Sequence, residues 1–266
     1  MNSRIDTVDD VRVYNRQAWN ELVRKSNRWT VPVSPDTTDR AREDDWQIIL
    51  TPEKPVPRDW FPDFRTDHVH VLCLAGSGGQ QAPILAAAGA DVTVLDNSPA
   101  QLAQDQFVAD RDGLSLRLIE GDMADLAMLQ NETFDLIVHP CSNCFAPNVL
   151  PVWREAARVL KPGGSLLSGF VQSHVFLFDD DLMDEGQFEL CHQIPYSDLG
   201  SLPDDRRRAL IESNEPVCFG HTMADQIGGQ IDAGLAIMGF YEDCWSDWPI
   251  CKYISAFAAT KATKLE

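Results

Sequence analysis

The sequence holds a glycine-rich turn and, 20 residues after its first glycine, a carboxylate that could bind the same ligand. Gly76-Ser77-Gly78-Gly79 lies between an apolar run at residues 69–74 and a helix-forming stretch at 80–88. Glycines in such a turn let the backbone approach a ligand where side chains would obstruct it. Asp96 ends the next apolar run and can accept two hydrogen bonds from a ribose diol. A ligand-free tight turn would also need glycine, and an acid would also stabilise a helix N-terminus, so the pair alone decides nothing.

A second acidic position follows the third apolar run. Gly121-Asp122-Met123 stands 26 residues after Asp96. A carboxylate there can accept from an adenine amino group, while the methionine packs on the ring. Both acids also suit a dinucleotide-binding dehydrogenase, but its G-x-G-x-x-G fingerprint needs a third glycine where Gln81 stands. Two further segments complete the series, Phe134-Asp135-Leu136-Ile137-Val138 and Leu160-Lys161-Pro162-Gly163-Gly164.

The elements that must position these residues alternate between strand and helix. Short apolar runs predict strands, and between them lie helical patterns, one starting at Ser98-Pro99 with an N-cap serine and a first-turn proline. Strands that are apolar on both faces indicate a parallel sheet covered by helices on both sides. Ligands bind such sheets at the carboxyl ends of the strands, so the turn after Leu74, Asp96, Asp122 and His139 should line one crevice. The predicted strands cover residues 69–74, 92–95, 114–119, 134–138 and 164–171, and the helices 80–88 and 149–160 besides the one at 98.

The flanking segments lack this alternation. Residues 1–65 predict one helix at 8–28 and then, because of six prolines, no long regular element; we interpret them as an N-terminal cap. Residues 172–215 break the rhythm with an acidic cluster and predict an insertion or lid. A helix at 223–238 and two strands at 239–245 and 253–260, which could pair with each other, should follow. We therefore expect one domain at 1–266, made of the cap (1–65), a cofactor-binding core (66–171), the insertion (172–215) and a C-terminal helix and hairpin (216–266).

In order and spacing, the four signals from the glycine turn to Lys161-Pro162-Gly163-Gly164 resemble the class I S-adenosylmethionine-dependent methyltransferase family. The resemblance runs from about residue 69 to 171. It implies a Rossmann-like, seven-stranded, mostly parallel sheet with helices on both faces, whose last strand is antiparallel and made by a terminal hairpin. It also implies S-adenosyl-L-methionine as cofactor. The cofactor-binding positions carried over are Ala75, Gly76, Ser77, Gly78, Gln80, Asp96, Asn97, Leu102, Asp122, Met123 and His139.

One departure concerns the first motif, in which the family often has an acid before the glycines. Here Cys73-Leu74-Ala75 stand at that place, so a backbone carbonyl or Gln80 would have to bind the amino group of the cofactor. His139 falls where the family contacts the methionine part of the cofactor.

Methyl transfer mainly requires alignment and the exclusion of water, and a general base only if the acceptor starts protonated. The catalytic residue is therefore not identified; His139 is a weak candidate for a base and could equally position the cofactor. The candidates for the substrate pocket are Tyr14, Trp29, Ser142, Asn143 and His221. Cys141-Ser142-Asn143-Cys144 has no second pair at a known spacing, so no metal is expected.

The charge and composition of the chain limit the classes of substrate and binding partner that we expect. The chain has 266 residues and a formal net charge of −19, from 22 Lys and Arg against 41 Asp and Glu. Such a surface repels phosphate backbones and anionic lipid, which favours a small-molecule acceptor over nucleic acid or membrane. The N-terminus lacks an apolar signal core, and the seven cysteines look like scattered buried thiols of a reducing compartment, so we expect a cytoplasmic protein of undetermined oligomeric state.

Three functions remain from the sequence. The first is a methyltransferase acting on a small molecule. The second is a non-catalytic S-adenosylmethionine-binding protein of the same fold, which the missing first-motif acid and the lack of an obvious base support. The third, an NAD(P)-dependent oxidoreductase, is disfavoured by Gln81 and by the segments at 134–138 and 160–164.

Overall fold

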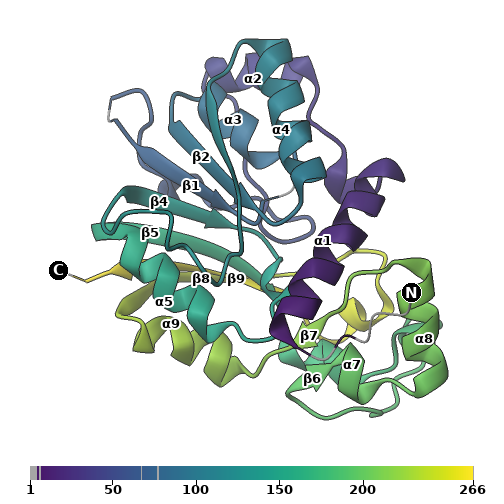
Figure 1. Ribbon diagram of the computed structural model, residues 1–266. Helices are drawn as coiled ribbons and strands as arrows, with labels where there is room; N and C mark the ends of the chain where they lie inside the picture. The colour runs from purple at the N-terminus through teal and green to yellow at the C-terminus, as the bar shows by residue number, and fades with distance from the viewer. Residues whose placement is uncertain (1–4, 6, 67, 77, 266) are drawn as a thin grey trace.

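A seven-stranded sheet in the order β3-β2-β1-β4-β5-β9-β8 organises the computed structural model, which describes residues 5, 7–66, 68–76 and 78–265 (Figure 1). Neighbouring strands from β3 to β5 are parallel, whereas β9 runs antiparallel to both β5 and β8. The Rossmann-like sheet with an antiparallel last strand is thus confirmed. The strands are β1 His70–Leu74, β2 Asp91–Asp96, β3 Leu116–Glu120, β4 Phe134–His139, β5 Leu160–Val171, β8 Leu235–Asp243 and β9 Phe257–Lys264.

Both faces of the sheet are covered, as the apolar runs predict. In β1, Val71 and Cys73 belong to the hydrophobic cluster on one face, and Leu72 and Leu74 to the cluster on the other. Helices α3 (Gln81–Ala87) and α4 (Pro99–Asp112) pack on the first side and α5 (Leu150–Val159) and α9 (Gly229–Asp232) on the second. The start predicted for α4 is confirmed, because Ser98 Oγ accepts from the amide of Gln101.

The N-terminal segment begins with the expected helix, α1 (Val8–Arg24), which lies beside the carboxyl ends of the strands (Figure 1). A capping box of Thr7 and Asp10 starts it. The prolines do not prevent a further short helix, α2 (Pro35–Arg42), because Ser34 caps it and its proline takes the first position, where no amide donor is needed. Two 3-10 turns, η1 (Arg28–Thr30) and η2 (Arg58–Trp60), complete this segment.

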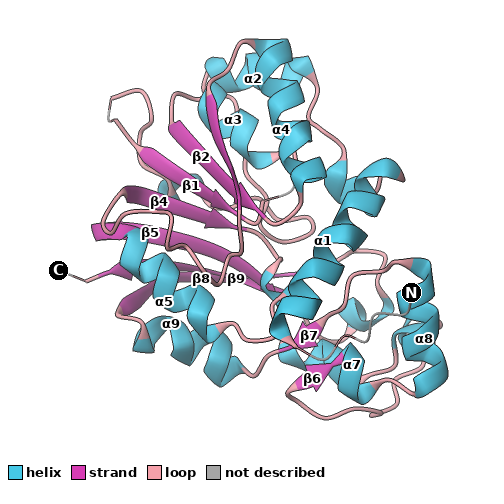
Figure 2. Cartoon of the chain, viewed as in Figure 1, coloured by secondary structure: helices cyan, strands magenta, loops and turns pink. Residues whose placement is uncertain are grey.

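The segment after β5 forms a small subregion beside α1 (Figure 2). Its two-stranded ribbon pairs β6 (Tyr196–Ser197) with β7 (Phe219–Gly220). The acidic run at its start is structured, because Asp179 caps α6 and forms an ion pair with Arg206. The other elements are η4 Ser173–Leu177, α6 Asp180–Asp184, α7 Asp198–Ser201 and α8 Asp204–Ser213.

The C-terminal part corrects two expectations. The helix predicted at 223–238 is wrong beyond residue 232: a π-helical turn, η5 (Ala224–Gly228), leads into α9, and Gly234, with φ 89°, ends the helical segment before β8 starts at Leu235. The predicted final strands do pair with each other. However, β8 begins at Leu235, before the predicted start at 239, and β9 spans Phe257–Lys264 instead of 253–260.

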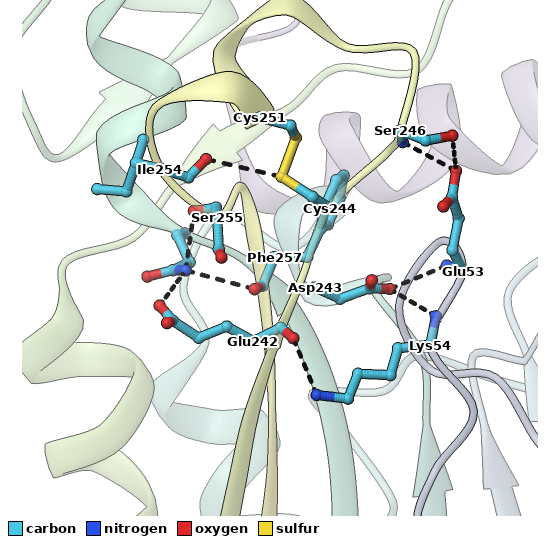
Figure 3. The surroundings of a disulfide bond; sticks show 11 residues. Glu53, Lys54, Glu242, Asp243, Cys244, Ser246, Cys251, Ile254, Ser255 and Phe257 are labelled. Carbon is cyan, nitrogen blue, oxygen red and sulfur yellow. Dashed lines mark hydrogen bonds between the residues drawn. A yellow bond between two sulfur atoms is a disulfide. The ribbon is translucent and has the colours of Figure 1, made fainter.

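The second correction concerns the cysteines. Cys244 and Cys251 form a disulfide across the loop between β8 and β9, which also contains η6 (Pro249–Lys252) (Figure 3). The interpretation of all seven as scattered buried thiols is therefore wrong; among the free cysteines, Cys141 and Cys218 are also only partly buried and Cys191 is exposed. Within the described residues, no helix is long and apolar enough to cross a membrane.

Candidate functional site

A cavity of about 860 Å³ opens at the carboxyl ends of the central strands. It lies where the sequence predicts a crevice, because parallel strands bring their following turns to one edge of the sheet. The predicted positions that line it are Ala75, Gly76, Gln80, Asp96, Asn97, Asp122, Met123, Trp29 and Ser142. Ser77 lies outside the described residues.

The glycine turn is held in place by helix α4. The amide of Gly78 donates to Gln101 Oε1 at 3.0 Å, and the amide of Gly79 donates to Asp105 Oδ1 at 2.8 Å. A Cβ on Gly78 would come within 2.5 Å of the Gln101 carbonyl oxygen, so only glycine fits there. Sequence reasoning missed both helix residues, although their spacing of four places them on one face of α4.

Asp105 is a buried carboxyl within this framework. Its exposed fraction is 1%, and burial raises its pKa well above the ordinary value although the Gly79 amide bond works in the opposite direction. Asp105 does not line the cavity, so it supports the turn from behind.

Asp96 lies at the end of β2 with its carboxylate toward the cavity. Its Oδ1 accepts from the Ser98 amide at 2.8 Å. Burial raises the pKa of Asp96 to about 7, against the effect of backbone hydrogen bonds from Asn97 and Ser98. The carboxyl is therefore close to half ionised at neutral pH, and a ligand that donates hydrogen bonds would favour its ionised form.

The next turn presents Asp122 and Met123. Asp122 Oδ1 accepts from the Ala124 amide at 2.9 Å, which fixes the carboxylate in an Asx turn. Met123 lies between the cavity and the core on the α5 side of the sheet. An acid and a thioether thus share this end of the cavity.

Helix α1 closes the edge of the cavity through polar contacts. Asn20 Oδ1 accepts from Ser98 Oγ at 2.8 Å and from the Ala100 amide at 3.1 Å. Asn97 Nδ2 donates to the Arg12 carbonyl at 2.8 Å, so this amide faces α1. Gln80 likewise uses its Nε2 on carbonyls of the N-terminal segment, those of Arg28 and Val31.

Aromatic side chains from distant segments form the other part of the wall. Trp29 and Trp245 lie with ring centroids 5.7 Å apart, and the Arg28 guanidinium lies over both rings, 4.8 and 4.5 Å from their centroids. The aromatic residues of this wall are Trp19, Trp29, Trp46, Phe145, Trp245 and Phe257. Only Trp29 among them was predicted.

Trp245 belongs to the disulfide-closed loop, which is fixed to the N-terminal segment (Figure 3). Asp243 Oδ2 accepts from the amides of Glu53 and Lys54, both at 2.9 Å, and the Ser246 amide donates to Glu53 Oε1 at 2.9 Å. Residues 46–52, which precede Glu53, are part of the cavity wall, which their sequence does not indicate.

Six predicted positions lie behind the wall. Tyr14 turns away and donates its hydroxyl to the Glu215 carbonyl at 2.9 Å, and burial raises its pKa to about 12. Leu102 is buried in the core, and Gly78 contacts α4. None of Tyr14, Gly78, Leu102, His139, Asn143 and His221 lines the cavity.

His139 is fully buried, and its Nδ1–H donates to the Leu74 carbonyl at 2.9 Å. Burial lowers its pKa to about 4, so the imidazole is neutral at physiological pH. Asn143 Nδ2 donates to Gln226 Oε1 at 3.0 Å, and His221 Nε2–H donates to the Asn143 carbonyl at 3.1 Å. These side chains are bound to the protein itself.

Comparison with known proteins agrees with this geometry. A model of the methyltransferase domain family matches residues 72–168. The chain is 50% identical over 252 residues to the uncharacterized methyltransferase YbaJ of Bacillus subtilis (strain 168), covering 95% of this chain and 98% of that protein. A solved S-adenosylmethionine-dependent methyltransferase from Mesorhizobium loti has a TM-score of 0.57 at 19% identity, covering 78% and 95% of the two chains. A 1,6-didemethyltoxoflavin N1-methyltransferase from Burkholderia thailandensis has a TM-score of 0.58 at 11% identity, covering 100% and 94%.

Proposed function

The chain belongs to the class I S-adenosylmethionine-dependent methyltransferases, and from this premise we propose that it methylates an apolar small molecule held against the aromatic wall of the cavity. One observation carries the proposal: the same cavity is lined by the turns after β1, β2 and β3 and by aromatic side chains from three distant segments. A cofactor and an acceptor can therefore meet within it. Membership of this family excludes the alternative of an NAD(P)-dependent oxidoreductase.

The residues at the strand ends fit the cofactor in the order in which they occur. We assign the ribose diol to Asp96, the adenine to Asp122 and Met123, and the methionine part to the backbone at Ala75 and Gly76. When bound, S-adenosylmethionine supplies a methyl group that its sulfonium charge already activates. The protein's task is then to orient the acceptor and exclude water, which the enclosing helix α1 and the aromatic wall can do.

The acceptor side favours apolar molecules with a flat ring. Trp29, Trp245 and Phe257 offer ring surfaces, and rings pack on rings with a gain beyond area burial. The formal net charge of −19 opposes nucleic acid as acceptor. His139 is neutral but does not line the cavity, so we do not propose it as the general base that removes a proton from the acceptor.

Calorimetric titration with S-adenosylmethionine tests the cofactor site. We expect wild-type binding and, for Asp96→Ala, a loss of about 1–3 kcal/mol, because charge-assisted hydrogen bonds to the ribose are removed. Asp91→Ala is the matched control: it lies on the same strand at the exposed end away from the cavity and should bind like the wild type. Failure of the wild type to bind would refute the proposed cofactor site.

Turnover to S-adenosylhomocysteine with a panel of apolar ring compounds tests the reaction. Trp245→Ala should raise KM for the acceptor and leave the cofactor Kd unchanged, because it removes acceptor wall only. A protein that binds the cofactor but turns over no compound of the panel would instead support the non-catalytic alternative.

A further inference from the structure

Three polar side chains lie side by side inside the sheet. His139 on β4 pairs in register with Ser168 on β5, which pairs with Thr260 on β9. All three have an exposed fraction of 0%. They face the α5 and α9 layer, because the rings of His139 and Trp153 of α5 form a T-shaped pair and Gln230 of α9 contacts Thr260. Polar groups this deep are normally paired, so their partners must be accounted for.

The π-helical turn supplies part of these partners. Thr260 Oγ1 donates to Gln230 Oε1 at 3.0 Å, and Gln230 Nε2 donates to the Gln226 carbonyl at 2.8 Å. Gln226 Oε1 in turn accepts from Asn143. A Cβ on Gly229 would come within 2.7 Å of Leu150 and Trp153 on α5, so glycine lets this segment pack closely against α5, beside the sheet residues that it contacts. The glutamine and glycine pattern at 226–230 thus has a structural reason.

Three side-chain atoms of this cluster, His139 Nε2, Asn143 Oδ1 and Ser168 Oγ, are among the buried atoms that have no hydrogen-bond partner within the described part of the chain. Because the Nδ1–H of His139 donates to Leu74, its Nε2 carries a lone pair and accepts. Asn143 Oδ1 also accepts, whereas the Ser168 hydroxyl can donate. The set needs two hydrogen-bond donors and one acceptor.

We propose that an ordered water molecule binds here, accepting from Ser168 and donating to His139 Nε2 and Asn143 Oδ1, and that it makes His139 a positioning residue for the cofactor turn. Three hydrogen bonds are typical of a buried water. A metal ion suits the three side chains less well, because all are uncharged and a buried charge would need compensation.

The water connects two walls of the cavity. His139 holds the carbonyl of Leu74, the residue directly before Ala75 and Gly76. Asn143 lies in the loop after β4 whose Ser142 also lines the cavity. A change at Ser168, which does not line the cavity, should therefore alter cofactor affinity; this consequence rests on the proposed function.

A spectroscopic test needs no cofactor. In the ¹⁵N-labelled chain, the imidazole of His139 should show the neutral Nδ1–H tautomer between about pH 5.5 and 8, since its pKa is lowered to about 4. A cross-peak with a long-lived water, or density for it in a high-resolution crystal structure, is expected. An Nε2–H tautomer, or a direct bond between His139 and Ser168, would overturn the proposal.

Ser168→Ala tests the link to the cofactor, with Ser165→Ala on the same strand as control, because its hydroxyl contacts Thr263 outside the cluster. We expect Ser168→Ala to shift the His139 resonances and to raise the S-adenosylmethionine Kd about three- to tenfold, as for one lost hydrogen bond. The control should change Kd less than about twofold. Unchanged resonances and Kd in Ser168→Ala would refute the inference. If the wild type binds no cofactor, the proposed function fails, and the water cross-peak at His139 or the crystallographic density still decides whether the water is present.

Discussion

The protonation of Asp96 should make cofactor binding depend on pH in the neutral range. Its pKa of about 7 results mainly from burial, which disfavours the charged form. In the proposed site the ribose diol donates to the ionised carboxylate of Asp96, so we expect the ionised form to be the one that binds. The ionised fraction is about one tenth at pH 6 and about nine tenths at pH 8. Because the apparent Kd scales inversely with the competent fraction, it should fall about tenfold between pH 6 and pH 8.

The same shift has the opposite effect on stability. A carboxyl whose pKa is raised in the folded state stabilises the fold most at pH values below its ordinary value of 3.8. That contribution is lost as pH rises toward 7 and is at most about 4 kcal/mol, from about three pKa units. Between about pH 6 and 7, where the two effects overlap, a rise in pH should lower the free energy of unfolding of the cofactor-free protein and increase its affinity for the cofactor.

Calorimetry at pH 6, 7 and 8 in buffers of different ionisation enthalpy measures both the affinity and the proton released on binding, expected to be about half a proton at pH 7. Asp96→Asn should bind weakly with a flat pH profile, and Asp91→Asn should keep the wild-type slope. A wild-type Kd that does not change from pH 6 to 8, or an unchanged slope in Asp96→Asn, would refute the reasoning.

Two further predictions concern the turn and the disulfide loop. Gly78→Ala should lower the free energy of unfolding by about 1–3 kcal/mol and abolish measurable cofactor binding, because its Cβ would clash with the backbone of α4. Gly200→Ala, with open space around the added methyl, is the control in thermal unfolding and calorimetry. Equal losses of stability and of binding in the two variants would contradict this explanation. Replacing Cys244 and Cys251 by serine should cost about 2–3 kcal/mol of stability, as expected for a loop of this length, and should raise the acceptor KM because the loop carries Trp245. Scanning calorimetry of the wild type with and without reductant tests the contribution of the disulfide to stability. A wild-type unfolding temperature that does not change with reductant would count against it.

The sheet was predictable because its signals are local. Each strand from β1 to β5 is a short apolar run bounded by turn residues, and its bounds agree with prediction within about four residues. The helix predicted at 223–238 extended too far because Leu235 and Ile237 continue an apolar pattern compatible with a helix. Pairing with β9, a non-local interaction, makes these residues a strand.

In the candidate site, too, the residues in local motifs were predictable and those brought in by long-range contacts were not. The strand-end residues Ala75, Asp96 and Asp122 follow directly from motifs and all line the cavity. The aromatic wall does not, because contacts between distant segments create it: the Leu50 carbonyl accepts from the Cys141 amide at 3.1 Å. The supporting residues of α4 could have been found from their helical spacing, but only once the turn was known to pack on that helix.

Helix α1 has a consequence for the order in which the molecule assembles. It is translated before the sheet, yet Asn20 bonds Ser98, 78 residues later, and Asn15 bonds the carbonyls of Phe145 and Val217, 130 and 202 residues later. Since such distant contacts form only after the intervening chain exists, the contacts of α1 cannot be complete before Val217 has been synthesised. A nascent chain that stops before Val217 therefore lacks one of the contacts that hold α1 at the edge of the cavity.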